Sequence, residues 1–116
     1  MTNEELDKFE ENLISALNGG NNEYISAYRR VLDQYGYTHG RRHDNVCQLY
    51  DELYSAPIKE SKLGDIAIKY GISDSTLLRR RKDFRDCFCY YLKIIITENN
   101  IKSEAATAAN FKPKKD

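Results

Sequence analysis

The chain has 116 residues, of which 18 are basic, 18 are acidic and 41% are hydrophobic. This size suits a single domain with a modest core, and no apolar run is long enough to cross a bilayer. Residues 1–13 are acidic and amphipathic, unlike a secretory signal, so we expect a cytoplasmic protein without a membrane role. The three cysteines, Cys47, Cys87 and Cys89, fit no disulfide framework and are expected to be reduced thiols.

The charge is unevenly distributed along the chain. Residues 1–24 contain six acidic residues and one basic residue, whereas residues 62–93 contain eight basic and four acidic residues. Salt limits the reach of each charged patch to about 10 Å, so a basic face could meet phosphate while an acidic end stays away from it. A neutral net charge therefore does not exclude a nucleic-acid-binding protein.

Three helices are predicted before residue 56. The first runs from about Asn3 to Leu17, with the capping-box pair Thr2 and Glu5 at its start. The second is capped by Asn22 and stops at Gly36. After a polar, basic loop at residues 37–43, the third runs from Asp44 to Ser55, and Pro57 closes it. The apolar stripes of the three helices are, in order, Leu6, Phe9, Leu13 and Leu17; Ile25, Tyr28, Leu32 and Tyr35; and Val46, Leu49, Tyr50 and Leu53.

The stretch "SKLGDIAIKYGISDSTLLRRRKDF", residues 61–84, predicts a helix-turn-helix. Ala67 is small where the two helices would cross, and Gly71 supplies the left-handed conformation that ends the first helix. Ile72 would fill the core between them, and Ser73 would cap the second helix. Leu77 then returns to the core.

The last helix is predicted to continue to about Thr97, followed by a disordered tail at 99–116. Its apolar stripe comprises Leu77, Phe84, Phe88, Tyr91 and Ile95. No strand pattern is evident. We predict an all-α fold of four to five helices in a single domain, residues 1–98, in which an N-terminal helical pair (1–36) precedes a trihelical helix-turn-helix core (44–97) with a long C-terminal helix.

The four consecutive cations at 79–82 are not equivalent on a helix that turns 100° per residue. With Leu77 buried, Arg79 and Lys82 point outward with Ser75, and these three residues and Ser73 are our candidates for reading bases. Arg81 lies towards the flank of the core face, where it would reach either phosphates or internal acids. The candidate phosphate contacts are Lys62, Arg80, Arg85, Arg41 and Arg42.

The motif L-x-x-I-A, a turn glycine, I-S, S-T-L and a basic run resembles the helix-turn-helix of region four in bacterial sigma factors. It is also similar to small phage and mobile-element regulators of the ArpU type. The resemblance covers about residues 61–92 and implies promoter DNA binding by the second helix and, in sigma factors, docking on RNA polymerase. Arg80 stands where that family usually has an apolar residue.

These observations predict a sequence-specific, double-stranded DNA-binding transcription regulator of bacterial or phage origin. Two alternatives stay open: an adaptor that binds protein, such as RNA polymerase, and a DNA-packaging or replication-initiation subunit. The nearly all-apolar stretch at 87–97 favours burial by the first helices or by a second copy in a homodimer.

No catalytic motif or phosphate-binding glycine loop is present, so we expect neither an enzyme nor a cofactor. His39, His43 and Cys47 are spaced four residues apart, but Gly36 and Gly40 argue against a continuous helix that would align them. We therefore expect no metal site.

Overall fold

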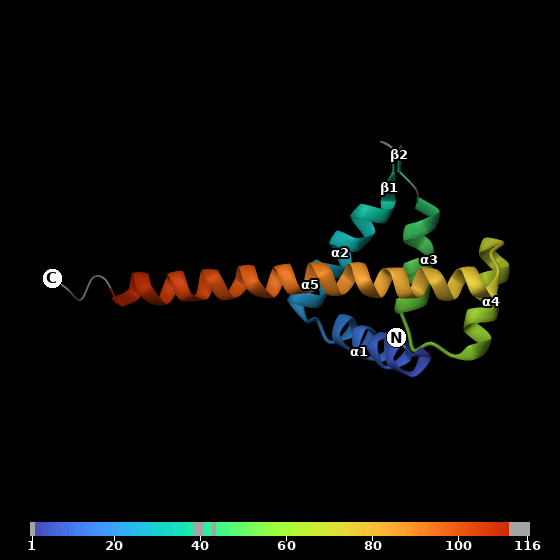
Figure 1. Ribbon diagram of the computed structural model, residues 1–116, viewed down its shortest axis with the longest axis horizontal. Coiled ribbons are helices and arrows are strands. Elements are labelled where there is room, and N and C mark those ends of the chain that lie inside the picture. The colour runs from blue at the N-terminus through green and yellow to red at the C-terminus, as the bar shows by residue number, and fades with distance from the viewer. Residues whose placement is uncertain (1, 39–40, 43, 112–116) are drawn as a thin grey trace.

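The computed structural model describes the backbone of residues 2–38, 41–42 and 44–111 and the side chains of residues 2–35 and 47–103. This part of the chain is all-α, as predicted. Its helices are α1 (Asn3–Asn18), α2 (Asn22–Gly36), α3 (Asp44–Tyr54), α4 (Glu60–Tyr70) and α5 (Asp74–Phe111). The 38-residue α5 forms a long axis, and α1, α2, α3 and α4 all pack along the part of it before residue 100 (Figure 1).

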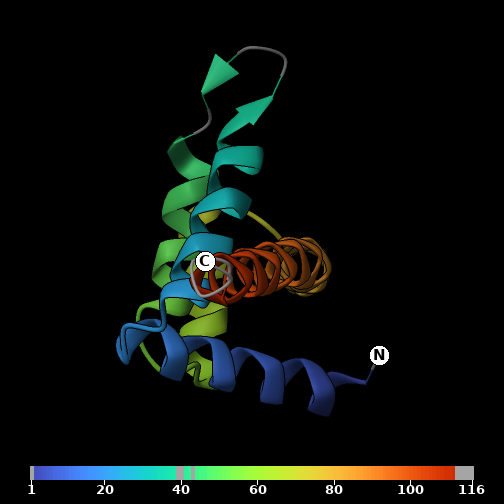
Figure 2. The ribbon, with the colours of Figure 1, turned by 90° about the vertical axis from the view of Figure 1, so that its left-hand side faces the viewer.

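Two short strands correct the expectation that no strand is present. β1 (Tyr37–Thr38) and β2 (Arg41–Arg42) pair antiparallel, with Tyr37 opposite Arg42. They form a small hairpin at the end of α2 and α3 that lies farthest from α1 (Figure 2). Strands of two residues are too short to show the alternating pattern by which a strand is predicted from sequence.

The core is built around Phe84 of α5, whose side chain is fully buried. Its ring centroid lies 4.7 Å from those of both Tyr50 and Tyr54 on α3, and 5.7 Å from that of Tyr28 on α2. Such tilted aromatic pairs contribute beyond the area that they bury. The predicted stripe of the last helix is therefore the side that meets α2 and α3.

The first two helices begin with side-chain caps. Thr2 Oγ1 accepts a hydrogen bond from the Glu5 amide at 3.2 Å, which confirms Thr2 as the cap of α1. The cap of α2 is Asn21 and not Asn22, because Asn21 Oδ1 accepts from the Tyr24 amide at 3.2 Å. The following residue, Asn22, is already helical.

The last helix continues 14 residues beyond Thr97, where the sequence predicted its end, so the expected tail is helical as far as Phe111. Residues 98–111 contain no glycine or proline and several alanines, so nothing in their backbone chemistry interrupts a helix. Figure 1 shows this part of α5 projecting beyond the other helices. We call residues 100–111 the arm.

Candidate nucleic-acid interface

The turn between α4 and α5 has the geometry that the sequence predicted. Gly71 is left-handed, with φ 66° and ψ 35°. The Ile72 amide donates to the Ala67 carbonyl at 3.0 Å and the Gly71 amide to the Ile68 carbonyl at 3.2 Å, which closes α4. Ala67 is buried beneath this turn, so the two helices approach closely. The turn therefore fixes the start of α5 relative to α4.

Ser73 holds the first turn of α5 and is engaged within the protein. Its Oγ accepts from the Thr76 amide at 3.1 Å and donates to Thr76 Oγ1 at 2.9 Å. The predicted cap is confirmed. A direct role of Ser73 in reading a base would require its hydroxyl proton to leave Thr76.

Ser75, Arg79 and Lys82 form what we call the outer face of α5. Ser75 and Arg79 are exposed and Lys82 is half-buried. Within the described part of the chain, neither Arg79 nor Lys82 forms an ion pair. Asp83 and Asp86 each follow one of these cations by four residues, but among the described residues neither pairs with them, and Asp86 binds Arg85 Nη2 at 2.9 Å. The charge of the outer face is therefore available to an external anion.

Arg81 points the opposite way, into the protein. Its side chain is only 7% exposed. Arg81 Nε donates to Glu10 Oε2 at 3.0 Å and Nη2 donates to Glu10 Oε1 at 2.5 Å, while Nη2 also reaches Asp7 Oδ1 at 3.2 Å. Of the two destinations open to this arginine, the structure selects the internal acids.

Glu10 is the residue of this region that the sequence prediction missed. It is 1% exposed and accepts a further hydrogen bond of 2.9 Å from the Tyr54 hydroxyl. Burial, together with the Glu10 charge, raises the pKa of Tyr54 well above its usual value. A signal was available, because Glu10 lies between Leu6 and Leu13 on the buried side of α1 and Arg81 lies between Leu77 and Phe84 on that of α5. A charged residue within the apolar stripe of each of two helices, one acidic and one basic, indicates that the two side chains form a buried ion pair.

The candidate phosphate contacts differ in how free they are. Arg80 is half-buried and forms no ion pair with the described residues, and its backbone carbonyl accepts from the Tyr50 hydroxyl at 3.2 Å. Lys62 Nζ donates to the carbonyls of Leu53 and Ala56 at 3.2 and 3.0 Å, so it caps the end of α3, and burial lowers its pKa. Arg41 and Arg42 are not among the residues whose side chains the structure describes.

Arg85 is also constrained within the protein. It is half-buried and forms an ion pair with Asp86, and its Nε is buried without a hydrogen-bond partner among the described residues. Arg80 is therefore the best placed of the described phosphate candidates.

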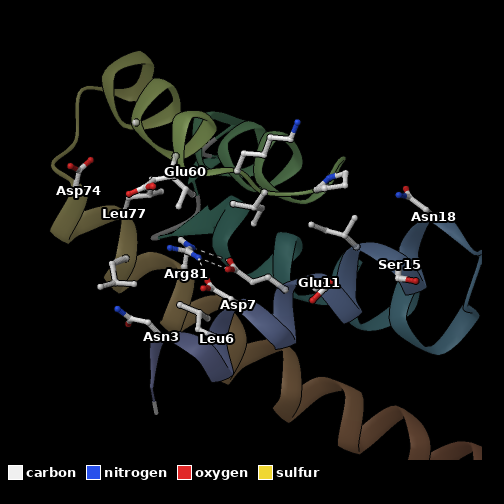
Figure 3. Close-up of a pocket in the computed structure, with 18 residues that line it drawn as sticks. Asn3, Leu6, Asp7, Glu11, Ser15, Asn18, Glu60, Asp74, Leu77 and Arg81 are labelled. Atoms are coloured by element: carbon white, nitrogen blue, oxygen red, sulfur yellow. Dashed lines mark hydrogen bonds and ion pairs between the residues drawn. The ribbon is translucent and has the colours of Figure 1, made fainter.

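A cleft of about 990 Å³ lies on the other side of α5, between α1, α4 and the first turns of α5. Figure 3 shows Arg81 at its centre, with Asp7 and Glu11 from α1 on one side and Glu60 and Asp74 on the other. The acidic residues of this cleft make it unsuitable for nucleic acid. A duplex would have to approach the outer face.

The described residues include only some of the side chains that we considered for a metal site. His39 and His43 lie outside the described residues. Cys47 Sγ donates to the Leu32 carbonyl at 3.6 Å, and Cys87 Sγ donates to Gln34 Oε1 at 3.3 Å. Among the described residues no group of three metal-ligating side chains comes together.

Comparison with known proteins adds no relative: no family model, curated protein or solved structure matches the chain. Within the described residues, no helix combines the length and the apolar character that spanning a membrane requires.

Proposed function

We propose that this chain binds double-stranded DNA sequence-specifically through α4 and α5, as a transcription regulator of bacterial or phage type. The observation that carries the proposal is the outer face of α5. It presents Arg79 and Lys82 without carboxylate partners among the described residues, directly after a helix-turn-helix turn closed by Gly71.

The first two turns of α5 would enter the major groove. A recognition helix contacts base edges with residues near its N-terminus, which here are Ser75 and Arg79. An arginine that donates to both acceptors of a guanine contributes about 1–3 kcal/mol of discrimination. The serine hydroxyl both donates and accepts, so it adapts to several base edges.

The carboxylates of α5 limit how far the contact could extend. Asp83 and Asp86 are exposed one turn beyond Arg79 and Lys82. They would repel phosphates, so the duplex should contact residues 73–82 and leave the rest of the helix clear. Arg80, on the flank, would hold one phosphate beside the groove.

Selection from a random duplex library tests the proposal. The native chain is compared with an Arg79→Ala/Lys82→Ala variant and with a Lys93→Ala/Lys102→Ala variant, which removes the same charge from exposed positions farther along α5. We expect an enriched motif with the native chain and the control, and none with the outer-face variant. A motif with two-fold symmetry would indicate a dimer.

Two single variants separate base contacts from phosphate contacts. Arg79→Ala should relax the motif at one position, at a cost of about 1–3 kcal/mol. Arg80→Ala should leave the motif intact and reduce the slope of log affinity against log salt by about one phosphate contact, or 0.9. If the Arg79→Ala variant weakens all sequences equally, Arg79 holds the backbone and does not read a base.

Failure of the native chain to enrich any sequence at low salt would contradict the proposal. The protein-binding adaptor would then be the better-supported function, and binding of RNA polymerase and other proteins to the outer face would be tested. If DNA binding holds, the mass of the DNA-bound assembly distinguishes a regulator from a packaging or replication-initiation subunit, since the latter would form a larger oligomer.

A further inference from the structure

We propose that the cleft between α1, α4 and α5 receives the C-terminal segment of a second copy of this chain, residues 108–116. This proposal goes beyond DNA binding and does not depend on it, because the cleft and the outer face lie on different sides of α5. Its evidence is the chemistry of the cleft and the position of the arm.

The cleft combines an apolar floor with an acidic rim. Leu6 and Leu77 are buried in its floor. Glu11, Glu60 and Asp74, one from each of the three helices, are exposed along the rim, and none of them forms an ion pair with the described residues (Figure 3). A volume of about 990 Å³ is at the upper end of those that hold a ligand or a short peptide.

Arg81 adds a hydrogen-bond donor to the cleft. Its Nε and Nη2 are occupied by Glu10 and Asp7, but Nη1 donates to no atom of the described residues. Arg81 is one of the residues that line the cleft, so we expect Nη1 to be the guanidinium nitrogen available to an occupant there. A guanidinium nitrogen in this position would bind a carbonyl oxygen, whereas the acidic rim around it would repel a free anion.

The C-terminal segment has the complementary chemistry. The last residue of α5 is Phe111, and Lys112, Lys114 and Lys115 follow it. The final carbonyls of a helix have no partner within that helix, so they are acceptors for a donor such as Arg81 Nη1. The lysines would meet the acidic rim and the aromatic residue would meet the apolar floor.

The occupant must come from another molecule. Phe111 follows Arg81 by 30 residues along one helix, which is a distance of about 45 Å at 1.5 Å per residue. Residues 112–116 span at most about 18 Å when fully extended, so they do not reach the cleft of their own chain. Figure 1 shows the arm pointing away from α4, which lines the cleft.

Sedimentation of the full chain without DNA tests the proposal. We expect self-association that weakens as salt is raised, because it relies on exposed charges. Reversal of the tail charges (Lys112→Glu, Lys114→Glu, Lys115→Glu) should weaken it at least about tenfold, as should reversal of the rim (Glu11→Lys, Glu60→Lys, Asp74→Lys). A chain that carries both sets should regain association.

Two matched variants control for general charge effects. Lys102→Glu changes an exposed lysine of the arm outside the tail, and Asp65→Lys changes an exposed acid of α4 that does not line the cleft. Both should associate like the native chain. Circular dichroism of every variant confirms that it is folded.

Several results would overturn the proposal: a chain that stays monomeric at the highest attainable concentration, association that is insensitive to both reversals, or no rescue in the combined variant. A basic peptide from another protein that occupies the cleft of a monomeric chain would overturn it too. A dimer would indicate reciprocal exchange of tails, and a larger assembly would indicate head-to-tail growth; both support the contact.

Discussion

Arg81 and Glu10 join α5 to α1 through two nitrogen–oxygen contacts, although 71 residues separate them in sequence. The arginine is 6% exposed and the glutamate 1% exposed, and Tyr54 contributes a third hydrogen bond from α3. A pair so deeply buried contributes little over an apolar pair of equal volume, yet it is costly to break, because either partner alone is a buried charge.

Removing Glu10 should therefore be severely destabilising. Glu10→Ala is expected to lower the free energy of unfolding by about 3–5 kcal/mol, since it leaves Arg81 buried without its principal partner. Urea denaturation followed by circular dichroism measures this change. The exposed neighbour Glu11→Ala, the matched control, should change it by less than about 0.5 kcal/mol.

The double variant Glu10→Leu/Arg81→Met should be more stable than Glu10→Ala alone, because no charge then remains buried. A Glu10→Ala variant as stable as the native chain would show that the pair does not form in solution.

Gly64 within α4 and Gly71 directly after it should respond in opposite directions to alanine. Gly71→Ala forces a side chain into a left-handed conformation (φ 66°) and should cost about 1–2 kcal/mol. Gly64→Ala lies inside the helix with open space around the added carbon, and should stabilise by about 0.5–1 kcal/mol. Thermal denaturation of both variants measures the two changes in stability. An unaffected Gly71→Ala variant would argue against the turn that positions α5.

Ser73 and Ser75 should separate structure from recognition. Ser73→Ala removes the cap of α5 and should cost about 1 kcal/mol of stability, because the Thr76 amide loses its acceptor. Ser75→Ala should leave stability unchanged and alter only the selected DNA motif. Chemical denaturation and library selection on the same two variants measure the two effects, and the reverse assignment would exchange the roles proposed for these residues.

The buried tyrosines predict a loss of stability at alkaline pH. Burial, and the nearby Cys87, Asp83 and Asp86, raise the pKa of Tyr35 from 10.0 to about 12. Burial likewise raises the pKa of Tyr50 and of Tyr28, the latter helped by its hydrogen bond to Asp51. The folded state retains these protons longer than the unfolded state, so their stabilising contribution is complete below pH 10 and is lost as the pH rises towards 12.

Tyrosinate absorbance and the free energy of unfolding, both measured against pH, check this expectation. Tyr35→Phe should reduce the fall in unfolding free energy at alkaline pH, because phenylalanine has no proton to lose. Titration of all nine tyrosines together near pH 10, without loss of stability, would contradict it.

The arm should contribute little to the stability of the body. Asn99, just before the arm, donates a hydrogen bond of 3.3 Å to Glu23 of α2, and within the arm Ile101 is 60% exposed. A chain ending at Asn100 should lose less than about 0.5 kcal/mol of unfolding free energy, measured by urea denaturation. The same truncation should abolish the self-association proposed above. A large loss of unfolding free energy would contradict this expectation and show that the arm stabilises the packed helices.

Local signals were the most predictable from the sequence. The cap at Thr2, the left-handed Gly71 and the cap at Ser73 each depend on residues within a few positions of one another. Burial on α2 was less predictable. Ala27 and Val31 are its fully buried residues, whereas the larger predicted residues Tyr28 and Leu32 flank them. Small residues lie where helices approach most closely, and hydrophobicity alone does not identify them.

The candidate interface was predictable only in part, because partners distant in sequence decide it. Helical periodicity placed Arg79 and Lys82 on the outside, but it left Arg81 between phosphate and internal acids. The choice depended on Glu10, whose position opposite α5 follows from packing. The length of α5 also exceeded the prediction, since its last buried residue in the described side chains is Ile95, while the helix continues to Phe111.

The uninterrupted course of α5 from Asp74 to Phe111 has a consequence for the geometry of any assembly. The outer face and the arm are two ends of one rigid rod, so their rotational phase is set by the number of residues between them. One residue inserted at the exposed position 98 would turn the arm by about 100° and advance it by about 1.5 Å without disturbing the core. Seven inserted residues would nearly restore the original direction, so the two ends would again face their partners at the native angle, about 10 Å farther apart.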